Sequence, residues 1–233
     1  MTYTTFIYTI IIGFLCGGLI PVTASRFGKV LPADPGLILA NLWHRPRCPK
    51  IKTGNRYLLW RYKWRKMAVY SLGWALIMAG LFSCAYAFIG EDVLVWSCSF
   101  LFVIGLLMAI DQQYFLLPDF FTIPLLFMGF GFAVLTDMIS PMDSFVGAVF
   151  GYILCTASVF VMNLFRKAEF GAGDVKMVTA LGAWLGYMPL NITLLLSFIF
   201  FAIWSVWQGK RTGAFGPALG LATIIMLFVT YSK

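Results

Sequence analysis

Eight apolar segments follow one another along this chain of 233 residues, and they constrain its fold more than any other feature. They cover residues 5–24, 67–89, 93–110, 120–136, 144–165, 177–188, 190–207 and 214–231. In this chain 61% of the residues are hydrophobic and only 11% are charged. About a quarter of the residues of a soluble domain are charged, so the chain has too few charged residues to form the surface of such a domain. A helix crosses a bilayer with about 20 mainly apolar residues. The sequence therefore predicts an all-α, polytopic transmembrane helical bundle of about eight spans.

The segment 177–188 is short for a complete span. Gly182 and Gly186 lie within it, and small residues let neighbouring membrane helices approach closely. We therefore expect this helix to pack tightly inside the bundle.

Positive charge is restricted to a few connectors. Sixteen of the 17 Lys and Arg residues lie in 26–66, 166–176 and 210–211. Cytoplasmic loops of membrane proteins collect Lys and Arg, so these three connectors are predicted to share the cytoplasmic side and both termini to lie outside. The net charge of +8 then reports topology. The expected partner of this surface is the lipid bilayer, and no nucleic acid is expected.

Cysteine and histidine spacing argues against a metal site. The five cysteines form no CxxC pair, and only Cys48 lies near the single histidine, His44. A zinc site needs three or four ligands at suitable spacing. We therefore predict that the chain binds no metal.

Two of the nine acidic residues lie where a charge is costly. Asp111 ends the apolar run 93–110, and Asp174 stands just before the run that begins at 177. Ionisable groups at membrane level are expensive and mark functional sites. Two carboxyls in a partly dry site share a proton, so one can activate water while the other protonates a leaving group. This is aspartyl protease chemistry, which requires no metal or cofactor.

The positions of the acids on their helices suggest roles. Asp174 is expected at a helix amino terminus, which favours its anion, and Asp111 at a carboxyl terminus, which disfavours it. We therefore expect Asp174 to act as the general base and Asp111 to carry the shared proton. Asp119 follows Pro118, as at an ordinary helix start, and is expected to cap that helix.

Two motifs carry a family resemblance. Asp111-Gln-Gln-Tyr-Phe-Leu-Leu-Pro-Asp119 and Gly171-Ala-Gly-Asp174-Val-Lys176 resemble the signature motifs of type IV prepilin peptidases, which are membrane aspartyl proteases of the GxGD type. Gly213-Ala-Phe-Gly216-Pro217 is similar to a Phe-Gly-Pro element near their last span. The resemblance covers about 90–231 and implies that Asp111 and Asp174 are catalytic. The further motif residues are Asp119, Gly171, Gly173 and Lys176.

The resemblance also implies a substrate and a location. The expected substrates are prepilins or pseudopilins of type IV pilus or type II secretion systems. Their basic leader would be cut after a Gly and before the apolar helix, on the cytoplasmic side of the bacterial inner membrane. The peptidase domain would occupy 67–233 and need no cofactor for proteolysis. The resemblance does not identify the substrate pilin or the oligomeric state.

Residues 1–66 comprise the first span and the large cytoplasmic loop. Many members of the family methylate the new amino terminus with S-adenosylmethionine through this region. Here Pro21 stands where Asn is expected, Lys66-Met67 where an acidic residue often precedes the second span, and the loop keeps only Cys48 of two CxxC pairs. The region is either degenerate or still a methyltransferase, and the sequence leaves both open.

Three other functions compete. A membrane transporter would spread acidic residues through the bilayer depth, yet 5–24, 67–89 and 214–231 contain none. A nonenzymatic pilus-assembly protein would tolerate loss of either Asp111 or Asp174. The presenilin-like GxGD proteases are the nearest rival among peptidases. Those proteases carry a Pro-Ala-Leu element in a later span. We expect no such element in the later spans of this chain, and the prediction is therefore against that group.

Overall fold

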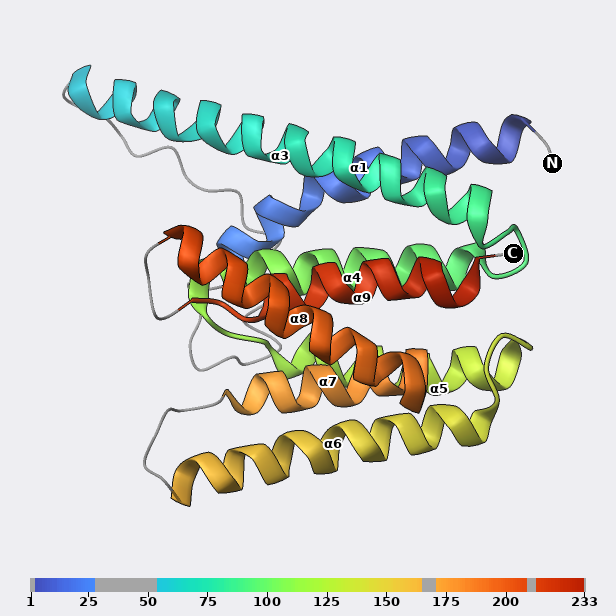
Figure 1. The fold of residues 1–233 in the computed structure, drawn as a ribbon. Coiled ribbons are helices and arrows are strands. Elements are labelled where there is room, and N and C mark those ends of the chain that lie inside the picture. The colour runs from blue at the N-terminus through green and yellow to red at the C-terminus, as the bar shows by residue number, and fades with distance from the viewer. Residues whose placement is uncertain (1–2, 28–53, 165–170, 209–212, 233) are drawn as a thin grey trace.

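The computed structural model describes residues 3–27, 54–164, 171–208 and 213–232, and these ranges form eight helices and no strand (Figure 1). Each of the eight predicted apolar segments corresponds to one helix, so the all-α prediction is confirmed. The helices are α1 (Tyr3–Phe27), α3 (Gly54–Phe88), α4 (Leu94–Tyr114), α5 (Asp119–Leu135), α6 (Pro141–Leu164), α7 (Ala172–Leu185), α8 (Tyr187–Gln208) and α9 (Gly216–Tyr231).

Five of these helices, α1, α3, α4, α6 and α8, are long and apolar enough to cross a membrane. Helices α5 and α9 are apolar but shorter, and α7 has only 14 residues. The largest difference from the predicted boundaries is at α3, which begins at Gly54 and not near Met67. The apolar segment used for the prediction ends where the charged residues begin. Charged residues do not terminate a helix, and no proline interrupts 54–66. Part of the predicted loop is therefore helical.

The centre of the bundle is an aromatic cluster around Trp184 of α7, which is fully buried. The Trp184 ring packs against Phe100 of α4 and Phe132 of α5. Its indole N–H donates to the carbonyl oxygen of Leu125 at 2.8 Å, and the Tyr231 hydroxyl donates to the carbonyl oxygen of Trp184. Because polar groups buried among apolar side chains must be hydrogen-bonded, these bonds fix α5, α7 and α9 to one another.

Helix α7 also packs closely against α6. A Cβ atom on Gly147 or on Gly182 would collide with the backbone of the other glycine. Gly186, which ends α7, has φ +77°, a conformation that glycine adopts without steric cost. The expectation of tight packing at Gly182 and Gly186 is confirmed.

The helices run back and forth through the bundle, so that α1 begins and α9 ends at the same end (Figure 1). At the opposite end α4 terminates and α5, α7 and α9 begin. Helices α3, α6 and α8 extend further at that end than α5, α7 and α9 do (Figure 1). The two predicted catalytic residues, near the end of α4 and the start of α7, are therefore at one end of the bundle.

Candidate active site

Asp111 lies in the last turn of α4 and is 5% exposed. Within the described part of the chain it is the only charged side chain that is buried. Its Oδ2 accepts a hydrogen bond from the backbone N–H of Gly216 at 2.7 Å. A backbone N–H can only donate, so a proton carried by Asp111 belongs on Oδ1.

Gly216 is the first residue of α9. The amino terminus of α9 therefore points at the Asp111 carboxylate, and helix amino termini favour anions. Sequence position alone puts Asp111 at the unfavourable end of α4, but α9 offsets this effect. The helix dipoles therefore no longer give a reason to assign the general base to Asp174 and the proton to Asp111. The two residues are better described as a pair that shares one proton.

The hydrogen bond from the Gly216 N–H to Asp111 involves no side chain of Gly216, so the residue type alone does not indicate it in the sequence. A Cβ atom on Gly216 would lie 2.6 Å from Asp111 Oδ2, so only glycine fits there. One turn later, a Cβ atom on Gly220 would collide with the Met108 side chain. The spacing of four between these glycines is the small-residue pattern that brings membrane helices together, and it is the signal that could have placed α9 against α4.

Asp174 occupies the first turn of α7. Its backbone N–H donates to the carbonyl oxygen of Gly171 at 3.0 Å, and a Cβ atom on Gly171 would lie 3.2 Å from Asp174 Oδ2. A Cβ atom on Gly173 would lie 2.9 Å from Cβ of Leu117, in the α4–α5 connector. Both glycines of the GxGD sequence thus make room, one for the Asp174 carboxyl and the other for the approach of α7 to the end of α4.

The carboxyls of Asp111 and Asp174 are close enough for their charges to interact. Asp174 is half-buried and Asp111 is buried, so little solvent screens this interaction. Two such groups do not ionise together readily, and such a pair can hold one proton between its members. The arrangement can therefore take a proton at one oxygen and deliver one from another.

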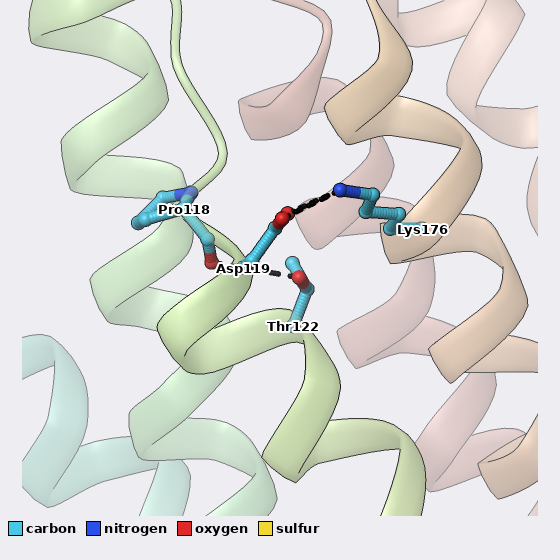
Figure 2. A network of polar contacts seen from close by, with 4 residues as sticks. All are labelled: Pro118, Asp119, Thr122 and Lys176. Atoms are coloured by element: carbon cyan, nitrogen blue, oxygen red, sulfur yellow. Dashed lines mark hydrogen bonds and ion pairs between the residues drawn. The ribbon is translucent and has the colours of Figure 1, made fainter. Parts of the chain in front are cut away.

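Asp119 and Lys176 form an ion pair beside the site, as Figure 2 shows. Lys176 Nζ lies 2.7 Å from Oδ1 and 2.6 Å from Oδ2 of Asp119. The expectation that Asp119 caps α5 is wrong: Pro118 holds the N-cap position, and the cap has no side-chain hydrogen bond. Thr122 instead donates to the carbonyl oxygen of Pro118 at 3.4 Å. The ion pair ties the start of α5 to α7, two residues after Asp174.

The described residues contain no group of three or more His, Cys, Asp or Glu side chains that could hold a metal. Cys48 and His44 lie outside the described residues, so their inability to complete a zinc site stays a prediction.

A cleft of about 730 Å³ lies between α1, α3 and α4, where its lining includes Pro21, Arg65, Lys66 and Tyr70. This lining contains no carboxylate. S-Adenosylmethionine carries a carboxylate as well as a sulfonium and an ammonium group, so Arg65 and Lys66 would attract one end of it and repel its cations. The lining of this cleft supplies no anionic partner for those cations.

Residues 97–206 match the model of the type IV leader peptidase family. Asp111, Asp119, Asp174 and Lys176 all fall within the match. The match covers 110 of the 233 residues, just under half of the chain. Gly216 lies beyond the matched residues, as do helices α1 and α3.

Similar curated proteins carry the name prepilin leader peptidase/N-methyltransferase. The one from Aeromonas hydrophila is 36% identical over 126 residues, or 51% of this chain and 43% of its own length. The one from Klebsiella pneumoniae is 41% identical over 93 residues, 40% of this chain and 41% of its own. The one from Escherichia coli (strain K12) is 38% identical over 135 residues, 55% and 60% respectively. The matched part of the chain thus spans about half the length of these relatives. No solved structure matches the chain.

The family match also bears on the presenilin-like alternative. Pro217-Ala218-Leu219 opens α9, so the chain does contain a Pro-Ala-Leu element, and its supposed absence is no argument against that group. The leader peptidase match over 97–206 supports the prediction instead.

Proposed function

We propose that this protein is a membrane aspartyl endopeptidase that removes the basic leader of prepilins or pseudopilins. The observation that carries the proposal is that Asp111 and Asp174, 63 residues apart, lie at the same end of an apolar bundle: Asp111 is held by the first residue of α9, and α7 begins against Leu117 in the connector that follows α4. The leader peptidase match over 97–206 and the names of the relatives support the substrate class.

The chemistry uses the shared proton of the pair. The ionised carboxyl takes a proton from water, whose oxygen attacks the scissile carbonyl carbon, while the protonated carboxyl donates to the carbonyl oxygen. When the C–N bond of the tetrahedral intermediate breaks, the leaving nitrogen takes up the proton from the first carboxyl, and one hydroxyl of the intermediate returns its proton to the second carboxyl as the new carboxyl product forms. The Gly216 N–H holds Asp111 Oδ2 in place throughout, so Asp111 needs no reorganisation during the reaction.

The depth of the site supports cleavage at a membrane boundary. Asp111 lies near the end of an apolar span and Asp174 at the start of a short helix. A substrate whose apolar helix rests in the bilayer would present the junction with its leader at this level. Arg65 and Lys66 are exposed near this end, and by the positive-inside rule we assign it to the cytoplasmic side of the inner membrane, with both termini periplasmic. Such a surface repels a basic leader, so recognition falls on the apolar segment.

Methyl transfer is left out of the proposal. The relatives' names include N-methyltransferase, but the residues that match the family model exclude α1 and α3. Proteolysis needs only the two Asp residues, and we propose it alone.

The test is cleavage of a model prepilin by the purified protein in detergent, with mass spectrometry of the product. Asp111→Asn and Asp174→Asn should each lower the rate by at least about 10²-fold, because an amide keeps the shape but transfers no proton. Asp137→Asn, an exposed acid at the other end of the bundle, is the matched control and should cleave normally. Normal cleavage by the Asp174→Asn variant would eliminate the aspartyl mechanism. A pilus-assembly protein without enzymatic activity, or a transporter, would release no leader with any variant.

A further inference from the structure

The carboxyl end of α1 meets the carboxyl end of α4, and a tyrosine joins the two helices (Figure 1). The hydroxyl of Tyr114, the last residue of α4, donates to the carbonyl oxygen of Ser25 at 3.1 Å. Ser25 is in the last turn of α1, where carbonyl groups have no partner within the helix. The bond therefore satisfies an acceptor that the end of α1 leaves open, and it joins residues that are 89 apart in the sequence.

Helix α1 is itself held firmly, because its glycines pack directly on α3. A Cβ atom on Gly13 would lie 2.9 Å from the carbonyl oxygen of Met78. One turn later, a Cβ atom on Gly17 would collide with the carbonyl oxygen of Trp74. Glycines that allow this close approach bring membrane helices tightly together. The Ser25 carbonyl is therefore a fixed point to which the end of α4 is attached.

A second tether reaches the same part of α4 from α3. The Tyr70 hydroxyl donates to Oε1 of Gln112 at 3.2 Å, and Gln112 directly follows Asp111 in α4. Tyr70 is 41% exposed, whereas Tyr114 is partly buried against the core. Water competes for an exposed hydrogen bond, so the Tyr114 bond is the stronger of the two tethers.

Tyr114 lies between the contacts that place the two catalytic acids. Asp111 stands one turn before it in α4, and Leu117 stands three residues after it in the α4–α5 connector. Leu117 is the residue that Gly173 approaches, at 2.9 Å from an added Cβ atom, and Asp174 follows Gly173 directly. A displacement of Tyr114 would therefore move Asp111 through α4 and Asp174 through the contact between the connector and α7.

The start of the connector is strained and requires support. Phe115 has a φ of 54°, in the left-handed region where a bulky residue is an outlier. Its N–H donates to the carbonyl oxygen of Asp111 at 2.9 Å and closes the last turn of α4. A strained conformation persists only where the surrounding contacts determine it. The hydrogen bond of Tyr114, the residue directly before Phe115, is such a contact.

We propose that Tyr114 is a positioning residue for peptide-bond cleavage, which transmits the fixed position of α1 to both catalytic acids. The inference rests on the proposed endopeptidase function and adds to it a contribution from α1, which lies outside the residues that match the family model. Tyr114 acts through the backbone and takes no part in proton transfer. The peptidase unit then includes α1 and does not begin at residue 67.

The experiment measures cleavage of a model prepilin by Tyr114→Phe, which removes only the hydroxyl. For the folded protein, kcat should fall about tenfold, because a displacement of a fraction of an ångström at catalytic groups slows the reaction. KM should stay within about twofold of the wild-type value, since no contact with the substrate is removed. Tyr70→Phe, at the exposed tether, should lower kcat by only about threefold.

Tyr231→Phe is the matched control for loss of stability. It also removes a hydroxyl that donates to a backbone carbonyl of another helix, that of Trp184, but it does so at the opposite end of the bundle. Its thermal stability should fall, because a buried carbonyl loses its partner. Its kcat, corrected for the folded fraction, should equal that of the wild-type protein.

A second measurement follows the end of α4 without turnover. Hydrogen exchange of backbone amides is measured by mass spectrometry on peptides that cover 111–118. Exchange there should be about fivefold faster in Tyr114→Phe, because a turn that loses a tether opens more often. Exchange of the same peptides should be unchanged in Tyr231→Phe.

Different results refute the two proposals. A wild-type protein that cleaves no prepilin overturns the proposed function, and this inference with it. If the wild-type protein cleaves, an equal kcat in folded Tyr114→Phe and Tyr231→Phe overturns the inference alone. Unchanged exchange at 111–118 in Tyr114→Phe also overturns it, as does an effect confined to KM, which would make Tyr114 a substrate-binding residue.

Discussion

Replacing Gly216 by alanine tests whether the amino terminus of α9 holds the catalytic acid. The added Cβ atom would lie 2.6 Å from Asp111 Oδ2, where ordinary contacts begin at 3.4 Å. Either α9 or Asp111 must therefore move by about 0.8 Å. If the movement is along the hydrogen bond, the N–H···Oδ2 distance of 2.7 Å grows to about 3.5 Å, beyond the range of a sound hydrogen bond.

The size of the effect follows from this displacement. A hydrogen bond to a charged group contributes about 1.5–3 kcal/mol, and a misplacement of about 1 Å at a catalytic group costs roughly 10²-fold in rate. We therefore expect Gly216→Ala to lower kcat/KM for prepilin cleavage by about 10²-fold. Overpacking should also lower stability by about 1–3 kcal/mol, so the folded fraction is measured by thermal unfolding in the same detergent.

Gly213→Ala is the control for this experiment. Gly213 lies three residues earlier, and the nearest atom to its added Cβ would be a Phe201 ring carbon at an ordinary 3.6 Å. That variant should cleave within about threefold of the wild-type rate, since it removes no contact of the site. A folded Gly216→Ala protein that cleaves as fast as Gly213→Ala would refute the proposed role of the α9 amino terminus.

Four further outcomes are expected. Asp119→Asn and Lys176→Met should each lower cleavage less than tenfold, because both side chains are about half exposed and such ion pairs contribute about 0–1 kcal/mol; a complete loss would give Asp119 a catalytic role. The rate should fall both at acid pH, where both catalytic carboxyls are protonated and no base remains, and at alkaline pH, where the shared proton is lost; a rate that stays flat into alkali would contradict this. In a cysteine-free background, an impermeant label added to intact cells should modify Asp137→Cys and not Gly213→Cys, and the reverse pattern would invert the topology. Cleavage with S-adenosylmethionine present should yield an unmethylated product and should survive chelation, and a methylated product would restore activity to the region before α3.

Within the described residues, the sequence predicted which segments are helical better than it predicted where each helix begins and ends. Apolar runs mark membrane helices because the bilayer requires them, and each of the eight runs is a helix. Hydropathy placed the start of the second run near Met67, but α3 begins at Gly54. A helix continues through charged residues as long as its backbone bonds are made, so hydropathy cannot locate such an end.

The acids of the site could be predicted, whereas their environment could not. Asp111 and Asp174 stand out because charge is rare in apolar runs, and the resemblance paired them across 63 residues. The Gly216 N–H is a backbone group, identical in every residue except proline, so its role depends on the packing of α9 against α4. The Asp119–Lys176 pair joins residues 57 apart, and no spacing within one helix predicts it. The capping expectation for Asp119 failed because tertiary contact outweighed a local preference.

The short length of α7 has a consequence for the surrounding lipid. Its 14 residues rise about 21 Å, while the hydrocarbon core of a bilayer is about 30 Å thick. Helices α5 and α9, which begin at the same end, have 17 and 16 residues and rise about 24–26 Å. Because most of α7 is buried among its neighbours and α3, α6 and α8 extend further at that end, the start of α7 lies below the ends of the longer helices. A substrate helix that packs beside α7 therefore meets a thinner apolar layer there than in free membrane. Its first residues are thereby brought out of the hydrocarbon toward water at the level of Asp174, where a hydrolytic enzyme needs them.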